Sequence, residues 1–164
     1  MISLVRLDER MIHGQVAVKW SRVLNVDRIL VANDEAAADD LIKKSLMMAA
    51  PNTVKTAIVS VEKAIGILND PRGEGLKILV IVRTPDDLLK LAEAVPGIND
   101  VNLGNYGRIN SRNASGEARP RKQLNLYLYD DEVETLSKVN AKVKKMVYQT
   151  MPDDQPVPFD KIAK

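Results

Sequence analysis

Short runs of Val, Ile and Leu alternate along this chain with longer amphipathic stretches, and this alternation limits the folds that it can adopt. The apolar runs are short and almost continuous, as is typical of strands that are buried on both faces. Strands that alternate with helices form parallel sheets covered by helices on both sides. The sequence therefore predicts an α/β fold with a single open, mostly parallel sheet of about six or seven strands.

The expected elements follow from the same pattern. Strands are predicted at 2–7, 28–32, 53–59, 78–82, 100–103, 124–128 and 143–149, and helices at 15–24, 35–50, 61–69, 85–94 and 131–141. Two helices have recognisable entry residues, Ser60 before one and Thr84-Pro85 at the start of another. No linker interrupts the pattern, so residues 1–164 are predicted to form one domain. Its proline-rich end, 152–164, is expected to be an extended surface strap.

Composition excludes several classes of function. The 164 residues include no cysteine, which excludes disulfide frameworks, cysteine-type zinc sites and thiol nucleophiles. A single histidine excludes sites that need two imidazoles. The net charge of +2 is too small to indicate a general polyanion binder. No apolar stretch approaches the roughly 18 residues of a membrane span, and the first residues do not resemble a signal peptide, so we expect a cytosolic protein.

The segment 104–123 breaks the pattern. It has no periodicity and carries five of the 24 basic residues but only one acidic residue, Glu117. The basic residues are Arg108, Arg112, Arg119, Arg121 and Lys122. A loop of this length inside a compact domain is often functional, but a solvated flexible arm would have the same composition. Both interpretations stay open at this point.

The only histidine lies in a second informative segment, 8–14, between the first predicted strand and the first predicted helix. In parallel α/β sheets, ligands bind beyond the carboxyl ends of the strands. Free backbone N–H groups and the dipole at a helix N-terminus favour anions such as phosphate there. Gly14 has no side chain to obstruct a ligand, and Gln15 stands where the helix begins. This segment is the predicted functional site.

Its side chains suggest phosphoryl transfer. A neutral His13 imidazole can attack phosphorus and form a phosphohistidine, which can pass its phosphoryl group onward. Arg10, and with it Arg6, could supply positive charge to the phosphate oxygens, and Asp8 could orient the imidazole. A histidine that is merely hydrogen-bonded, beside an Arg–Asp pair at a helix entry, is the competing interpretation.

These residues resemble a known family. The run RLDERMIHGQV over 6–16 is similar to the R-[IV]-D-x-R-[LM]-I-H-G-Q-V signature of the IIB components of the mannose/fructose/sorbose class of the bacterial sugar phosphotransferase system. The resemblance extends over nearly the whole chain, through Trp20, 57–65, 84–88, 102–104 and 151–154. Its implied fold, an open and mostly parallel α/β sheet, agrees with the elements predicted above.

The resemblance implies a phosphoryl carrier, a component of a protein-N(pi)-phosphohistidine–sugar phosphotransferase. In this family, phosphate passes from phosphoenolpyruvate through enzyme I, HPr and a IIA protein to the IIB histidine. IIB then phosphorylates the sugar as the membrane components IIC and IID carry it inward. By the motif match, His13 is the phosphorylated residue, with Nδ1 as the favoured nitrogen, Arg10 stabilises the phosphate, and Asp8 is its neighbour.

Further expectations follow from the resemblance. No nucleotide, metal or organic cofactor is expected, and the sequence contains neither a Walker A motif nor G-x-G-x-x-G. The protein would be cytoplasmic and peripherally associated with the transporter. The sugar is not readable; the hexosamine subgroup, with N-acetylgalactosamine as an example, is one candidate. The sequence leaves open whether the protein forms homo-oligomers.

One segment departs from the family pattern. Members commonly carry N-x-G-G-M after the fifth strand, whereas this chain has NLGNYG over 102–107. The basic stretch that follows also looks longer, which leads to the hypothesis that Arg108, Arg112, Arg119 and Arg121 dock acidic surfaces of IIA or of the membrane components. Two alternatives to the carrier are a non-catalytic sensor or scaffold that binds phosphate or a phosphometabolite, and a nucleic-acid binder. The latter is disfavoured because the basic loop lacks interleaved aromatic residues.

Overall fold

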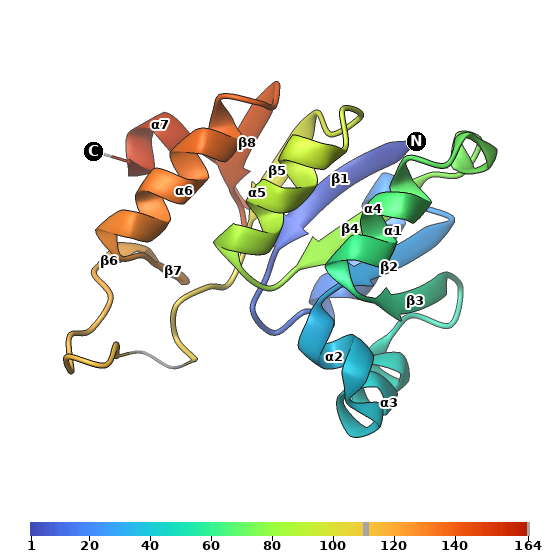
Figure 1. The fold of residues 1–164 in the computed structure, drawn as a ribbon, viewed down its shortest axis with the longest axis horizontal. Helices are drawn as coiled ribbons and strands as arrows, with labels where there is room; N and C mark the ends of the chain where they lie inside the picture. The colour runs from blue at the N-terminus through green and yellow to red at the C-terminus, as the bar shows by residue number, and fades with distance from the viewer. Residues whose placement is uncertain (110–111, 164) are drawn as a thin grey trace.

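The structure is a computed structural model that describes residues 1–109 and 112–163. A seven-stranded sheet in the order β3-β2-β4-β1-β5-β8-β9 forms its centre (Figure 1). Paired strands run parallel except β9, which is antiparallel to β8. The predicted α/β fold is confirmed. The strands of this sheet are β1 (Ile2–Leu7), β2 (Arg28–Ala32), β3 (Lys55–Val59), β4 (Ile78–Val82), β5 (Asp100–Leu103), β8 (Lys145–Tyr148) and β9 (Val157–Pro158).

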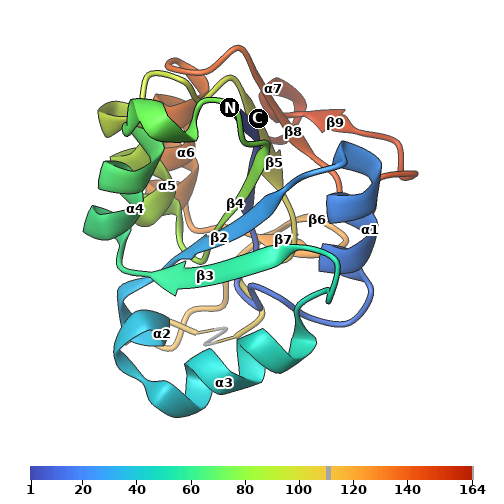
Figure 2. The same ribbon diagram turned by 90° about the vertical axis from the view of Figure 1, so that its right-hand side faces the viewer.

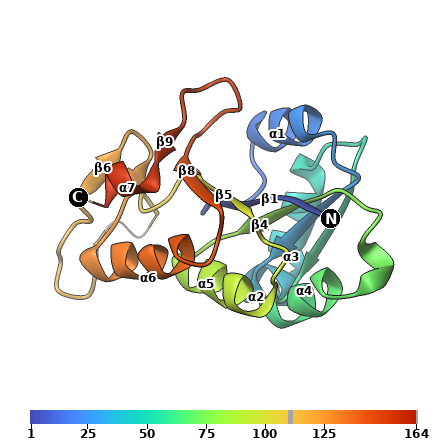
Figure 3. The ribbon, with the colours of Figure 1, turned by 90° about the horizontal axis from the view of Figure 1, so that it is seen from above.

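Helices cover both faces of the sheet. Figures 2 and 3 show α4, α5 and α6 side by side on one face and α1 on the other. The helices are α1 (Val16–Leu24), α2 (Asp34–Ala38), α3 (Asp40–Ala49), α4 (Val61–Leu68), α5 (Pro85–Ala94), α6 (Asp130–Asn140) and α7 (Phe159–Ile162), with a 3-10 turn η1 (Pro71–Gly73). This arrangement explains why β4 is apolar at every position, since both faces of the sheet are buried there.

The core accordingly has two layers. Along β4, Val80 and Val82 pack into the layer under α4, α5 and α6, whereas Leu79 and Ile81 pack into the layer that contains residues of α1 and α3. All five residues of β4 are buried. Each such side chain contributes about 1.5–3 kcal/mol of stability relative to an exposed one.

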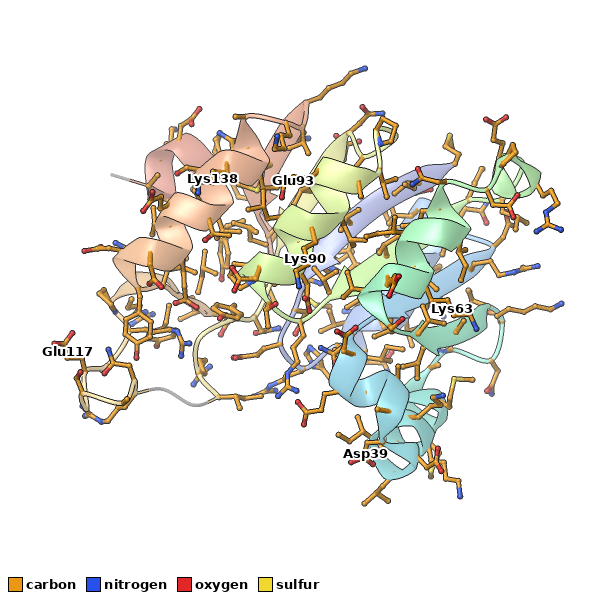
Figure 4. All side chains as sticks on the ribbon, viewed as in Figure 1. Asp39, Lys63, Lys90, Glu93, Glu117 and Lys138 are labelled. Carbon is orange, nitrogen blue, oxygen red and sulfur yellow. The ribbon has the colours of Figure 1, made fainter. Side chains whose placement is uncertain are left out.

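Helix entries agree with the sequence in two places and differ in one. Ser60 Oγ accepts from the N–H of Lys63, and Thr84 Oγ1 accepts from the N–H of Asp87, as expected of N-caps. The single helix predicted over 35–50 is wrong, because Asp39 has an extended backbone and divides it into α2 and α3. Asp39 lies at the corner between these helices (Figure 4), where its Oδ1 accepts backbone N–H groups of the first turn of α3.

The strand predicted over 124–128 is wrong as a member of the main sheet. Its centre forms β7 (Leu126–Tyr127), which pairs antiparallel with β6 (Arg121–Gln123), a strand that the absence of periodicity concealed. Leu126 and Leu128 are fully buried in the core layer under α6. They are apolar because they pack in this layer, although they do not belong to the main sheet.

The end of the chain also differs from the predicted strap over 152–164. Residues 157–158 form β9, and the next four form the short helix α7. Phe159 and Ile162 are three positions apart, share one side of this helical turn and are buried in the core. Lys164 lies outside the described residues.

The loops that follow the parallel strands meet at one edge of the sheet. There β1 lies between β4 and β5. The hydrogen bond from Asp8 N to Val82 O (2.9 Å) continues its pairing with β4, and that from Gly104 N to Leu7 O (2.8 Å) continues its pairing with β5. The segment after β1 is therefore held between two neighbouring loops.

Candidate active site

Asp8 is the centre of the predicted site. Its Oδ2 accepts from Arg6 Nη2 (3.3 Å) and Asn105 Nδ2 (3.2 Å) and lies 3.1 Å from His13 Nε2. Its Oδ1 accepts from the backbone N–H of Arg10 (3.0 Å). The carboxylate is 0% exposed and thus has protein partners in place of water. The structure therefore brings the predicted residues Arg6, Asp8, Arg10 and His13 together.

The ionisation of Asp8 is set by opposing effects. Burial raises the pKa of its carboxyl, but the hydrogen bond with His13 and the positive charge of Arg6 lower it more, and the pKa lies below its ordinary value. Asp8 is therefore a carboxylate at neutral pH.

This carboxylate determines which tautomer a neutral His13 adopts. An ionised carboxylate can only accept hydrogen bonds, so a neutral His13 donates from Nε2 and carries its lone pair on Nδ1. The side chain of His13 is 22% exposed and can be reached from solvent. The arrangement can thus present a neutral, oriented nucleophile to a ligand outside the protein.

The loop between Asp8 and α1 has an unusual backbone. Met11 has φ +63°, in the left-handed region that favours glycine, and Gly14 has φ +47°. A left-handed residue with a β-carbon costs about 1–2 kcal/mol. Met11 and the adjacent Ile12 bury their side chains in the core layer that also contains Trp20, which offsets that cost. Met11 and Ile12 are thus held in the core, whereas His13, the next residue, is partly exposed at the surface.

Arg6 occupies a different place from the one expected of a phosphate ligand. Its side chain is 2% exposed, and Nη1 donates to Gln149 O (2.9 Å) and to Asn102 Oδ1. The guanidinium also lies 5.4 Å from the centre of the Trp20 ring. Burial lowers the pKa of Arg6, while Asp8 acts in the opposite direction. Arg6 therefore supports the Asp8 carboxylate from inside the protein.

Arg10, Gly14 and Gln15 lie on the solvent side. The Arg10 side chain is exposed, and within the described residues its guanidinium makes no hydrogen bond or ion pair. Gln15 is the N-cap residue of α1 and makes no side-chain cap, and the backbone N–H of Val16 donates to His13 O (3.3 Å). An exposed positive charge and the uncapped start of α1 thus flank His13 in the sequence, an arrangement that favours anions.

The arginines of the 104–123 loop do not form one group. Arg108 Nη1 donates to Asn125 Oδ1 (3.2 Å), Arg112 Nη1 donates to Gly116 O (2.7 Å), and Arg121 is exposed on β6. Glu117 marks the outer end of this loop, away from the sheet (Figure 4).

Arg119 differs from these three. Its Nε donates to Glu132 Oε1 (2.8 Å), and its guanidinium lies 5.3 Å from the Tyr106 ring and 4.5 Å from the Tyr129 ring. With 14% of its side chain exposed, it joins the loop to α6 rather than projecting toward a partner.

Two site residues were missed by the sequence interpretation, Asn105 and Glu9. The Glu9 carboxylate accepts from the backbone N–H groups of Arg108 (2.9 Å) and Ile109 (3.3 Å), which attaches the basic loop to the His13 loop. A signal existed for Asn105, since it follows the predicted strand 100–103, whose carboxyl end shares an edge with that of the first strand.

Comparison with known proteins adds the family context. Residues 2–164 match the family described as the PTS system sorbose subfamily IIB component. A probable phosphotransferase enzyme IIB component of Streptococcus pyogenes serotype M6 is 40% identical over 124 residues, which are 76% of each chain. The mannose-specific EIIAB component of Escherichia coli K12 is 33% identical over 142 residues, which are 87% of this chain and 42% of that protein.

A solved structure agrees with the fold. The IIB domain of the sorbose permease from Klebsiella pneumoniae is similar with a TM-score of 0.87 and 26% identity, over 98% of this chain and 95% of that one. In residues 1–109 and 112–163, no helix combines the length and apolar character needed to span a membrane.

Proposed function

Because this chain belongs to the sorbose subfamily of phosphotransferase-system IIB components, in the mannose class, we propose that it accepts a phosphoryl group from a phosphorylated IIA protein on His13 and transfers it to a sugar. It would thereby act as a protein-N(pi)-phosphohistidine–sugar phosphotransferase component. The observation that carries the proposal is the 3.1 Å contact between Asp8 Oδ2 and His13 Nε2, because it leaves Nδ1 as the nucleophile.

The proposed transfer has two steps. In the first, the Nδ1 lone pair attacks phosphorus in line, and the P–N bond to the donor histidine breaks as the new P–N bond forms. The donor imidazole leaves with the electron pair of its bond. In the second, a sugar hydroxyl attacks the same phosphorus, loses its proton to a base or to solvent, and returns the electron pair to Nδ1 of His13.

The charge that develops on the phosphoryl oxygens needs stabilisation. Arg10 is an exposed cation within the His13 loop. The first turn of α1, which follows Gly14 and Gln15 and has no side-chain cap, offers backbone N–H groups other than that of Val16, which donates to His13 O. The helix N–H groups are fixed before the reaction, and the Arg10 guanidinium, which has no partner within the described residues, can turn toward the phosphoryl oxygens. Such charge stabilisation lowers the barrier of phosphoryl transfer. Asp8 keeps the imidazole oriented, and Arg6 keeps Asp8 ionised.

Docking completes the proposal. IIA and the membrane components IIC and IID are the proposed partners, so the protein would work at the cytoplasmic side of its transporter. The E. coli relative is named as an EIIAB component, which supports a IIA partner. Arg108, Arg112 and Arg121 are the proposed docking cations, whereas Arg119 already pairs with Glu132. The acceptor is proposed as a sugar without further identity, because the relatives' names include both mannose and sorbose.

Intact-mass spectrometry tests the carrier role directly. The protein is incubated with phosphoenolpyruvate, enzyme I, HPr and the cognate IIA, and we expect a gain of one phosphoryl group that is labile in acid and stable in base. His13→Ala should fold normally and gain nothing. Arg10→Ala should slow the gain strongly, while Arg22→Ala, a matched deletion in the last turn of α1, should not.

The opposite result would favour the alternative function. If IIA itself becomes phosphorylated while this protein gains no mass, the carrier role is wrong. Reversible binding of inorganic phosphate without covalent modification would then indicate the sensor or scaffold.

A further inference from the structure

We propose that Asn105 is a positioning residue for the phosphoryl transfer, which holds the Asp8 carboxylate against His13 and so keeps Nδ1 free of a proton. This inference rests on the proposed function for its catalytic meaning. It concerns a residue at which the chain departs from the N-x-G-G-M pattern, where a glycine would carry no side chain into the site.

The side chain of Asn105 contacts both members of the pair. Its Nδ2 donates to Asp8 Oδ2 (3.2 Å) and lies 3.5 Å from His13 Nε2. The carboxylate oxygen that orients the imidazole is therefore bound on another side by the Asn105 amide. Asp8 cannot turn its Oδ2 away from His13 without losing this hydrogen bond as well.

The backbone of Asn105 is fixed to the same loop. Its carbonyl accepts from the N–H of Glu9 (2.8 Å), one step beyond the hydrogen bond from Gly104 N to Leu7 O. The pairing of β1 with β5 thus continues past the ends of both strands. On the other side, Tyr106 is anchored through Asn125 O (2.9 Å). The backbone of Asn105 is consequently held on both sides by hydrogen bonds, which fixes the position from which its side chain reaches Asp8.

The chemistry of an amide suits this position. An –NH₂ group can only donate, so it stabilises the ionised form of Asp8, which accepts hydrogen bonds. It cannot itself take the proton from His13 Nε2. A carboxylate of the same shape would add a second negative charge beside Asp8 and the imidazole. It would favour an imidazole protonated on both nitrogens, whose Nδ1 has no lone pair for attack.

The single histidine allows a test by ¹⁵N NMR of the imidazole. Asp8 contacts this ring, Arg6 contacts Asp8, and Arg10 lies three residues before His13 in the same loop. In the unsubstituted protein at neutral pH we expect the Nε2–H tautomer. In Asn105→Ala we expect a mixture of both tautomers and phosphorylation by phospho-IIA that is about tenfold slower, as for the loss of one hydrogen bond to a charged group.

Asn105→Asp extends the test with an isosteric side chain. We expect its imidazole to be doubly protonated up to a higher pH than in the unsubstituted protein, and its transfer to be slower than that of Asn105→Ala at neutral pH. Asn69→Ala is the matched control, because Asn69, at the C-terminal end of α4, donates from Nδ2 to the backbone carbonyl of Ala94 at the C-terminal end of α5, remote from the sheet edge that carries the site. It should leave tautomer and rate unchanged.

The outcomes separate the two proposals. If Asn105→Ala keeps the tautomer and the transfer rate of the unsubstituted protein, the positioning role is wrong while the carrier function stands. If the unsubstituted protein is never phosphorylated, the carrier function fails, and the NMR comparison still decides whether Asn105 sets the tautomer. A variant that only loses stability, with an unchanged tautomer, would also overturn the inference.

Discussion

Nη2 of Arg6 lies 3.3 Å from Oδ2 of Asp8, the same oxygen that orients His13. The two side chains are 2% and 0% exposed, so each charge depends on the other. In a buried ion pair, the removal of one partner leaves an uncompensated charge, which costs more than the intact pair contributes.

Asp8→Asn keeps the shape of the side chain but removes its charge. We expect it to lower the free energy of unfolding by about 3–5 kcal/mol, because Arg6 is left buried without a counterion. Urea unfolding measures the loss. Arg6→Met/Asp8→Asn should recover stability relative to Asp8→Asn alone while phosphorylation stays impaired. A single variant as stable as the unsubstituted protein would show that the pair is not electrostatically coupled.

Asp8 and Asp87 should titrate on opposite sides of the ordinary pKa of an aspartate. The pKa of Asp8 is lowered because His13 and Arg6 outweigh burial, whereas burial, with the nearby Asp34, raises the pKa of Asp87 despite its hydrogen bond with Thr84. The lowered pKa of Asp8 contributes stability above the unfolded pKa of 3.8, and this contribution is lost as the pH falls below it.

A titration of ¹³C-labelled aspartate carboxyls by NMR gives the order directly. Asp70 is the control, since Arg72 lowers its pKa to about 2 although its side chain is partly exposed and lies at the surface. Solvent screening should make the effect of Asp70→Asn on acid unfolding negligible. An Asp8 that protonates before Asp87 as the pH falls would contradict the assignment.

Gly104→Ala should disturb the site through Arg6. A β-carbon at this position would overlap the Arg6 guanidinium, which is held on its other sides and cannot retreat. We expect a loss of about 1–3 kcal/mol in urea unfolding, together with slower phosphorylation. Gly75→Ala has open space around its β-carbon and should change neither quantity. Equal behaviour of the two variants would show that the guanidinium is mobile.

Docking through the basic loop predicts a dependence on salt. Arg108→Glu/Arg121→Glu should slow phosphoryl transfer from IIA by about tenfold at low ionic strength, and should weaken the effect of added salt, because steering by opposite charge is lost. Arg28→Glu, at the opposite end of the strands, is a control that reverses one charge away from the loop. An unchanged rate and an unchanged salt dependence would remove the loop from the docking surface.

The local parts of the fold could be predicted from the sequence. Periodicity located β1, β2, β4, β5 and α5 at their observed bounds, because their burial pattern is written in consecutive residues. It failed at Asp39, where an extended residue whose side chain caps α3 divides one predicted helix into two. It also failed for the segment 124–128, whose leucines alternate as in a strand of the main sheet although only Leu126 and Leu128 are buried and β7 pairs with β6.

The site was predictable to the same extent. Arg6, Asp8, Arg10 and His13 lie within eight positions of one another, and their chemistry identified the loop. Asn105 and the Gln149 carbonyl lie about 100 and 140 positions away, and only the pairing of β1 with β5 and of β5 with β8 brings them near. The burial of Arg6 and the ion pair of Arg119 are likewise properties of tertiary packing.

The pairing of β1 with β4 and β5 also has a consequence for dissection of the protein. A peptide of the first 25 residues would contain every letter of the His13 signature, yet it would lack the partners that β4, β5 and the segment after β8 provide for Asp8 and Arg6. Such a fragment would carry an ordinary histidine. The signature is thus contiguous in the gene but assembled in space, and a cut after β5 would separate the halves of the site.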